Sequence, residues 1–186
     1  MENIEAAFIH SLNRINFMLK NQKFATECIK NYEGFTIFGE SIGPFEKGKK
    51  YNLKLFSAIP FIENDILKID QSKKCDNVDV QRYAIRERDD QKLIQTEDPL
   101  FLNIIKEFKR FMEEDIKKKK IPYINLDRYN SYLSSIIDNR LLKLLKLAKT
   151  DLSLDDERRL TYSEKLLFDQ VFNLIKQWRN FFITFE

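Results

Sequence analysis

The last third of the chain, residues 125–182, contains two long amphipathic segments joined by a short acidic linker. At about 100° per residue, the apolar residues of the first segment, 125–149, fall within one arc of roughly 180°. Those of the second segment, 161–182, cover about half of the helical wheel. A helix on the outside of a small domain usually buries a stripe only a little wider than about 100°. The pattern therefore predicts two helices with surplus apolar surface, and it favours both a central position in a bundle and a partner chain.

Three residues of the first segment depart from a simple amphipathic pattern. Arg140 projects from the middle of the apolar arc, whereas Leu142 and Leu145 lie on the otherwise polar side. One interpretation is that Arg140 extends its charge to solvent and that the leucines are ordinary surface residues. The other is that Arg140 is half-buried and held by a carboxylate or by helix-end carbonyls, with another chain covering the leucines.

The second segment has a recognisable start. Thr161, followed three residues later by Glu164, has the form of a capping box. We predict structural roles for Arg140, Thr161 and Glu164. The surplus apolar residues of the two segments predict a subunit interface, and its expected members are Leu142, Leu145, Phe172, Trp178, Phe181 and Phe182.

The N-terminal part predicts a leading helix and a small antiparallel sheet. Apolar residues recur every three or four positions over residues 4–19, and a polar stretch follows. The only strand-like region comes next: residues 34–38 are aromatic and β-branched, and residues 51–56 alternate apolar with polar. Between them Gly39, Gly43 and Gly48 are expected in turns, because the spacing of a phosphate-binding loop is absent. Pro60 is expected at the first position of a short helix.

A polar segment, residues 71–77, marks the expected domain boundary. We predict an N-terminal helix plus a small β-rich domain over 1–72, and an α-helical bundle domain over 78–186. Residues 78–94 are charged and predict a helix or an irregular connector. Asp98 and Pro99 signal another helix start, and the run 117–120 its end. With Gly 4 and Pro 4, the expected fold class is mostly α with a small β-rich part (α+β).

The residues that carry chemistry predict neither a catalytic nor a metal site. A single histidine, His10, cannot form a specific catalytic arrangement, and Cys28 and Cys75 are too few for a disulfide framework or a four-cysteine zinc site. We expect free thiols, no cofactor and no enzymatic activity. The net charge of +3 is spread evenly along the chain, unlike the basic footprint of a dedicated nucleic-acid binder. The run 117–120 could still contact a phosphate backbone, or simply match the helix dipole.

Charges interrupt every apolar run, so we expect no membrane-spanning segment. The first residues also lack the basic flank and apolar core of a signal peptide. An intracellular location is therefore expected.

The order and motifs of these segments resemble those of GINS complex subunits. The resemblance covers most of the chain, with the small domain preceding the helical one. This is the subtype related to eukaryotic GINS subunits two and three, in an archaeal-like form. Phe61 stands where the family usually has tryptophan. The motifs are GPF at 43–45, AIPF at 58–61, Asp138, Arg140, Lys143 and Leu144 in the long helix, and Leu160, Thr161 and Glu164 at the start of the last helix.

The resemblance implies a non-catalytic DNA replication factor. Such a subunit would join a complementary GINS subunit in a heterotetramer with two copies of each. The tetramer would assemble with and activate the MCM helicase, and link it to a RecJ-like replisome protein and to primase. It would act at the replication fork, in the nucleoid or, in a eukaryote, the nucleus, with weak or no direct DNA binding. The alternatives are a helical interaction module of another pathway and a nucleic-acid-binding adaptor.

Overall fold

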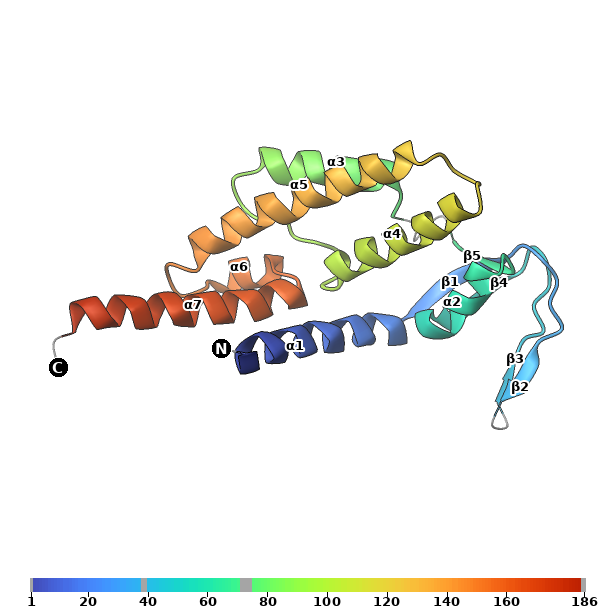
Figure 1. Ribbon diagram of the computed structural model, residues 1–186, viewed down its shortest axis with the longest axis horizontal. Coiled ribbons are helices and arrows are strands. Elements are labelled where there is room, and N and C mark those ends of the chain that lie inside the picture. The colour runs from blue at the N-terminus through green and yellow to red at the C-terminus, as the bar shows by residue number, and fades with distance from the viewer. Residues whose placement is uncertain (1, 38–39, 71–74, 185–186) are drawn as a thin grey trace. The chain divides into compact units, whose positions relative to one another are not determined.

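The computed structural model of the chain describes residues 2–37, 40–70 and 75–184 (Figure 1). The chain divides into two compact units, one of residues 16–74 and the other of residues 1–15 with 75–186. The expected leading helix is present as α1, Glu2–Asn21, and the division between the units falls within it.

The unit of residues 16–74 is built on a three-stranded antiparallel sheet. Its strands are β1 (Lys23–Cys28), β4 (Lys50–Lys54) and β5 (Leu67–Ile69), in the order β4-β1-β5. Ala25 pairs with Asn52 on one side of β1, and Glu27 pairs with Lys68 on the other. The central strand, β1, thus lies in the polar stretch that follows the leading helix, where no strand was expected. The expectation that residues 34–56 hold the only strands was wrong, because β1 alternates Phe24, Thr26 and Cys28 toward the core.

A separate hairpin pairs β2 (Phe35–Ile37) with β3 (Glu40–Ile42). It corresponds to the strand expected over 34–38, although Phe38 and the expected turn residue Gly39 lie outside the described residues. The backbone segments of Gly34 and Ile42 approach each other closely at the base of this hairpin. A Cβ atom on Gly34 would lie only 2.5 Å from the Ile42 carbonyl oxygen, so the position requires glycine. Gly43 and Gly48 have φ angles of 99° and 84°, so both occupy the left-handed region expected of turn glycines.

Helix α2 (Leu55–Glu63) follows β4 directly. The expectation that Pro60 begins this helix was wrong, since Pro60 lies inside it. The helix starts earlier because Leu55, Ala58 and Ile59 bury an apolar face before the proline is reached. The core beneath α2 contains Cys28, Phe45, Phe61 and Leu67.

Over its described residues 75–184, the other unit contains the helices α3 (Asn77–Asp89), α4 (Phe101–Lys117), α5 (Ile124–Leu147), α6 (Leu154–Arg159) and α7 (Tyr162–Ile183). The charged segment 78–94 is therefore mainly helical, and Asp76 caps α3 by accepting from the amide of Asp79 at 3.2 Å. The expected acidic linker contains α6, which Ser153 caps in the same way. Asp98 accepts from the amide of Leu100 at 2.7 Å just before α4, close to the expected start.

Helix α5 runs alongside α3 and has α4 and α7 as its other neighbours (Figure 1). Tyr129, fully buried on α5, donates to the Ile105 carbonyl of α4 at 2.9 Å. A core cluster joins α5 to α7 and contains Leu93, Leu144, Ala148, Leu160 and Phe168.

This arrangement confirms the expected class, mostly α with a small β part near the N-terminus. None of the helices in the described part of the chain is long and apolar enough to cross a lipid bilayer.

Candidate subunit interface

The start of α7 is fixed by the capping box expected from the sequence. The side chain of Thr161 accepts from the amide of Glu164, and the amide of Thr161 donates to Glu164 Oε2 at 2.8 Å. Both side chains are buried. These bonds satisfy two amides that a helix start would otherwise leave without partners.

Arg140 connects this helix start to two other helices. Its Nε and Nη2 donate to the two carboxylate oxygens of Glu164, at 2.6 and 2.8 Å. Its Nη1 donates to Glu87 Oε2 of α3 at 2.8 Å and to the hydroxyl of Tyr83 at 2.7 Å. Lys143, one turn along α5, donates to Glu87 Oε1 at 2.6 Å. We call these five residues the ionic cluster; it holds two cations and two carboxylates, which balance one another.

Arg140 is only 1% exposed, so it does not extend its charge to solvent. It agrees with the other interpretation of the sequence, in which a carboxylate or backbone carbonyls hold the guanidinium. The second hydrogen of Nη2 goes to the carbonyl of Arg159 at 2.9 Å, and Nη1 also lies 3.0 Å from the carbonyl of Ile94. Burial by itself lowers the pKa of Arg140, but the hydrogen bonds and charge of Glu164 raise it above its ordinary value. Burial also raises the pKa of Tyr83. At neutral pH Arg140 is therefore charged and Tyr83 protonated, so the Tyr83 hydroxyl can accept from Arg140 and also donate to Glu87 Oε2 at 3.3 Å.

The sequence did not single out Glu87 and Tyr83 as partners of Arg140. A signal was present, since Val80, Ala84 and Glu87 recur at helical spacing and all three are buried. A glutamate within such a stripe indicates a buried carboxylate that requires a cation.

The second half of α7 presents large apolar side chains to solvent. Trp178 is 66% exposed, Phe181 80% and Phe182 64%. The ring of Phe182 lies 5.1 Å, between centroids, from each of the other two. We call the exposed apolar side chains of this half the α7 aromatic surface; its members are Leu174, Trp178, Phe181, Phe182 and Ile183.

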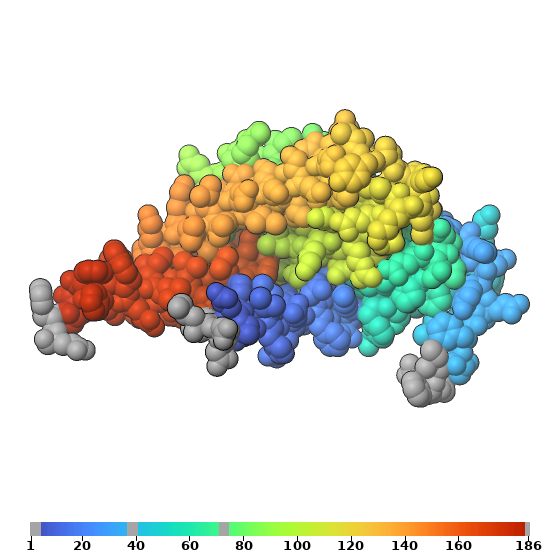
Figure 2. Space-filling view, in the orientation of Figure 1, coloured from blue at the N-terminus to red at the C-terminus, as the bar shows by residue number. Residues whose placement is uncertain are grey.

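The α7 aromatic surface is uncovered because the last turns of α7 extend past the end of α5 (Figure 1). In the space-filling view these turns, in red, reach beyond the orange atoms of α5 (Figure 2). Phe172, earlier on α7, is half-buried and stacks on Phe168 with 5.7 Å between ring centroids. Among the six residues predicted for the interface, Phe172 is the one that the chain's own core covers most.

The two leucines predicted for the interface are on the surface of α5. Leu142 is 59% exposed and Leu145 38%. A hollow of about 280 Å³ lies between the end of α5 and the second half of α7, bordered by Ala148, Ile175 and Ile183. Exposed apolar residues therefore occur on both helices that the sequence predicted to have surplus apolar surface.

No group of three or more histidine, cysteine or acidic side chains able to hold a metal occurs among the residues that the structure describes. Cys28 and Cys75 are free thiols, as expected. Burial, with the nearby charges of Asp79 and Asp76, raises the pKa of Cys75 to about 12. A thiol with so high a pKa is a poor nucleophile at neutral pH.

The lysine run at the end of α4 is partly engaged by its own helix. Lys117 pairs with Glu114 at 2.7 Å, and Lys120 pairs with Asp115 at 3.5 Å. Pairing with carboxylates weakens the attraction of these lysines for a phosphate backbone.

No protein-family model matches this sequence, and no curated protein matches it.

Proposed function

We propose that this chain is a non-catalytic subunit of the GINS complex, and that it binds a complementary subunit through the α7 aromatic surface. The observation that carries the proposal is the exposure of three large rings on an ordered helix. Each such ring offers roughly 150–250 Å² for burial. At the observed exposures the three together leave on the order of 400 Å² of apolar area in water, within the size range of the largest apolar patches on monomers, which are often functional.

The ionic cluster supports the same proposal in a different way. Arg140, Lys143 and Glu164 are among the residues that carry the resemblance to GINS subunits, and they lie together in one buried network. The motif residues thus act in holding α3, α5 and α7 together, which is the role of a scaffold rather than of an active site.

In the proposed complex two copies of this chain and two of the complementary subunit form a heterotetramer. That tetramer assembles with and activates the MCM helicase at the replication fork, and links it to a RecJ-like protein and to primase. The small β-rich unit and the outer faces of the helices would remain available for these contacts.

The test is co-expression with the complementary GINS subunit of the same organism, followed by size-exclusion chromatography with light scattering. We expect a stable hetero-oligomer with the mass of two copies of each subunit, and poor solubility or self-association when the chain is expressed alone. The double substitution Trp178→Asp and Phe181→Asp should abolish the complex. A matched control is Leu154→Asp, because Leu154 is 77% exposed and belongs to α6 rather than to α7.

Two results would contradict the proposal. A well-behaved monomer that ignores the complementary subunit would remove the GINS assignment, and would leave a helical interaction module of another pathway. A complex that survives the double substitution would place the interface elsewhere. Affinity for DNA that falls steeply with added salt, and that requires the lysines at 117–120, would instead favour the nucleic-acid adaptor.

A further inference from the structure

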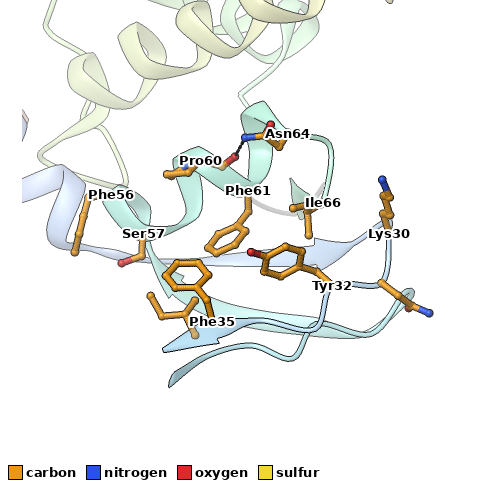
Figure 3. A pocket seen from close by; sticks show the side chains of 11 residues that line it. Lys30, Tyr32, Phe35, Phe56, Ser57, Pro60, Phe61, Asn64 and Ile66 are labelled. Carbon is orange, nitrogen blue, oxygen red and sulfur yellow. Dashed lines mark hydrogen bonds between the residues drawn. The ribbon is translucent and has the colours of Figure 1, made fainter. Parts of the chain in front are cut away.

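The unit of residues 16–74 contains a groove of about 1090 Å³. Its walls come from three segments: residues 30–32 after β1, the β2–β3 hairpin, and one face of α2 (Figure 3). The face of α2 that borders the groove carries Phe56, Ser57, Pro60, Phe61 and Asn64. Because these positions are related by steps of three and four residues, they form one continuous side of the helix.

Aromatic rings form the apolar part of the groove. The ring of Phe61 lies 5.6 Å from that of Tyr32 and 6.0 Å from that of Phe35, between centroids. Phe61 is buried and packs against both Tyr32 and Phe35, whereas Phe35 is 38% exposed. Phe56 stands at the opposite end from Lys30 and is 54% exposed (Figure 3). An incoming apolar side chain could therefore contact several rings at once.

Polar groups are placed along the same groove. Pro60 has no N–H, so the carbonyl of Phe56, four residues earlier, lacks the helix hydrogen bond that residue 60 normally donates. The hydroxyl of Tyr32 points into the groove (Figure 3), and Ser57 also lines it. The side-chain amide of Asn64 is already used, because it donates to the Pro60 carbonyl at 2.8 Å. The groove thus offers two hydroxyls, from Tyr32 and Ser57, which can exchange hydrogen bonds with a peptide ligand.

Charge and size narrow the choice of ligand. Of the described residues that line the groove, Lys30 is the charged one, and it stands exposed at one end. A positive end favours a negatively charged group on the ligand. The volume of about 1090 Å³ lies at the upper end of the roughly 300–1,000 Å³ that is usual for small-molecule pockets, so the groove has room for a stretch of polypeptide. The end of α7 is a poor candidate, because Lys176 and Arg179 flank Trp178 and would bring positive charge to Lys30.

We propose that this groove binds a short acidic peptide segment of another protein. The segment places an aromatic or aliphatic side chain against Phe35, Phe56 and Phe61. It also places a carboxylate within reach of Lys30. This site is separate from the α7 aromatic surface and does not depend on the proposed function.

The test begins with a display library of random twelve-residue peptides selected on the full chain. We expect enriched peptides to share an apolar residue and at least one Asp or Glu. A fluorescein-labelled enriched peptide is then titrated with wild type and variants, and its dissociation constant is measured by fluorescence polarisation. Lys30→Glu should weaken binding about tenfold or more, and Phe56→Ala about fivefold or more.

Matched controls lie on the same unit outside the groove. Lys23→Glu makes the same charge change at an exposed position of β1, and Phe17→Ala removes a ring that is 67% exposed on α1. Both controls should bind the peptide as wild type does. The Trp178→Asp and Phe181→Asp double variant should also bind normally, which separates this site from the subunit interface.

Several results would overturn the proposal. One is a selection without any enriched motif, and another is enrichment of basic peptides. A third is binding that Lys30→Glu and Phe56→Ala leave unchanged. A fourth is displacement of the peptide by a single-stranded oligonucleotide that itself depends on Lys30 and Phe56, because the groove would then be a base-stacking site for nucleic acid.

Discussion

Replacing Arg140 with alanine should lower the free energy of unfolding by about 3–5 kcal/mol, the usual effect of removing one partner from a buried ion pair. The change removes two methylene groups, at about 0.8 kcal/mol each, together with the donors that Glu87 and Glu164 accept from. The loss is limited because Glu87 keeps Lys143 and Glu164 keeps its bonds from Thr161. The lower half of the range is therefore expected.

The assay is chemical denaturation followed by circular dichroism, with the slope of the transition fitted for each variant. Arg128→Ala is the matched control, since Arg128 is exposed on the same helix; it should change the unfolding free energy by less than about 0.5 kcal/mol. Combining Arg140→Ala with Glu164→Ala should destabilise less than the sum of the two single changes. A loss below about 0.5 kcal/mol for Arg140→Ala, or strict additivity with Glu164→Ala, would refute the structural role of the ionic cluster.

Three further predictions use single positions. Phe168→Ala should cost about 3–5 kcal/mol of stability in the isolated chain, whereas Phe181→Ala should be close to neutral; equal losses in denaturation would show that the α7 aromatic surface is part of the chain's own core. Thr161→Ala should cost about 1–2 kcal/mol through loss of the α7 cap, compared with almost nothing for exposed Thr150→Ala; an unchanged melting transition would argue against the capping box. The pKa of Cys75 is raised to about 12 in the folded chain, so its thiol ionises at a lower pH in the unfolded chain. Its contribution to the free energy of unfolding is therefore fully present below about pH 9 and is lost as the pH rises toward 12. Cys75→Ala should flatten that decline by up to about 1.4 kcal/mol per pH unit, and an identical decline in both proteins would show that other groups cause it.

The long helices α4, α5 and α7 were predictable because their apolar residues recur at helical spacing, and α7 also has a readable start. The capping box at Thr161 and the periodicity of residues 125–149 place α5 and α7 to within a few residues. The strand β1 was not recognised, since its inward positions hold Phe24, Thr26 and Cys28. Only the first of these is strongly apolar, so a strand signal based on hydrophobicity is weak there.

The position of α2 illustrates a different limit. Proline at a first helical position is a statistical preference, and here the burial of Leu55 and Ala58 outweighed it. The helical spacing around Glu87 indicates a buried carboxylate, but the sequence does not pair it with Arg140. Glu87 and Glu164 are distant along the chain, and only the packing of three helices brings them together.

Exposure along α7 could not be derived from periodicity either. The helical wheel treats Phe168 and Phe182 alike, since both belong to one apolar face. The first is buried and the second is 64% exposed because α5 ends before α7 does. Which part of an amphipathic face is covered depends on the lengths of neighbouring helices, and this is a property of the folded unit.

The distance between the two ends of α7 has a practical consequence. Glu164 and Trp178 are fourteen residues apart on one continuous helix, or about 21 Å at 1.5 Å per residue. Changes at the far end therefore leave the buried anchor untouched, so the exposed side chains of this helix can be substituted without endangering the fold that holds them.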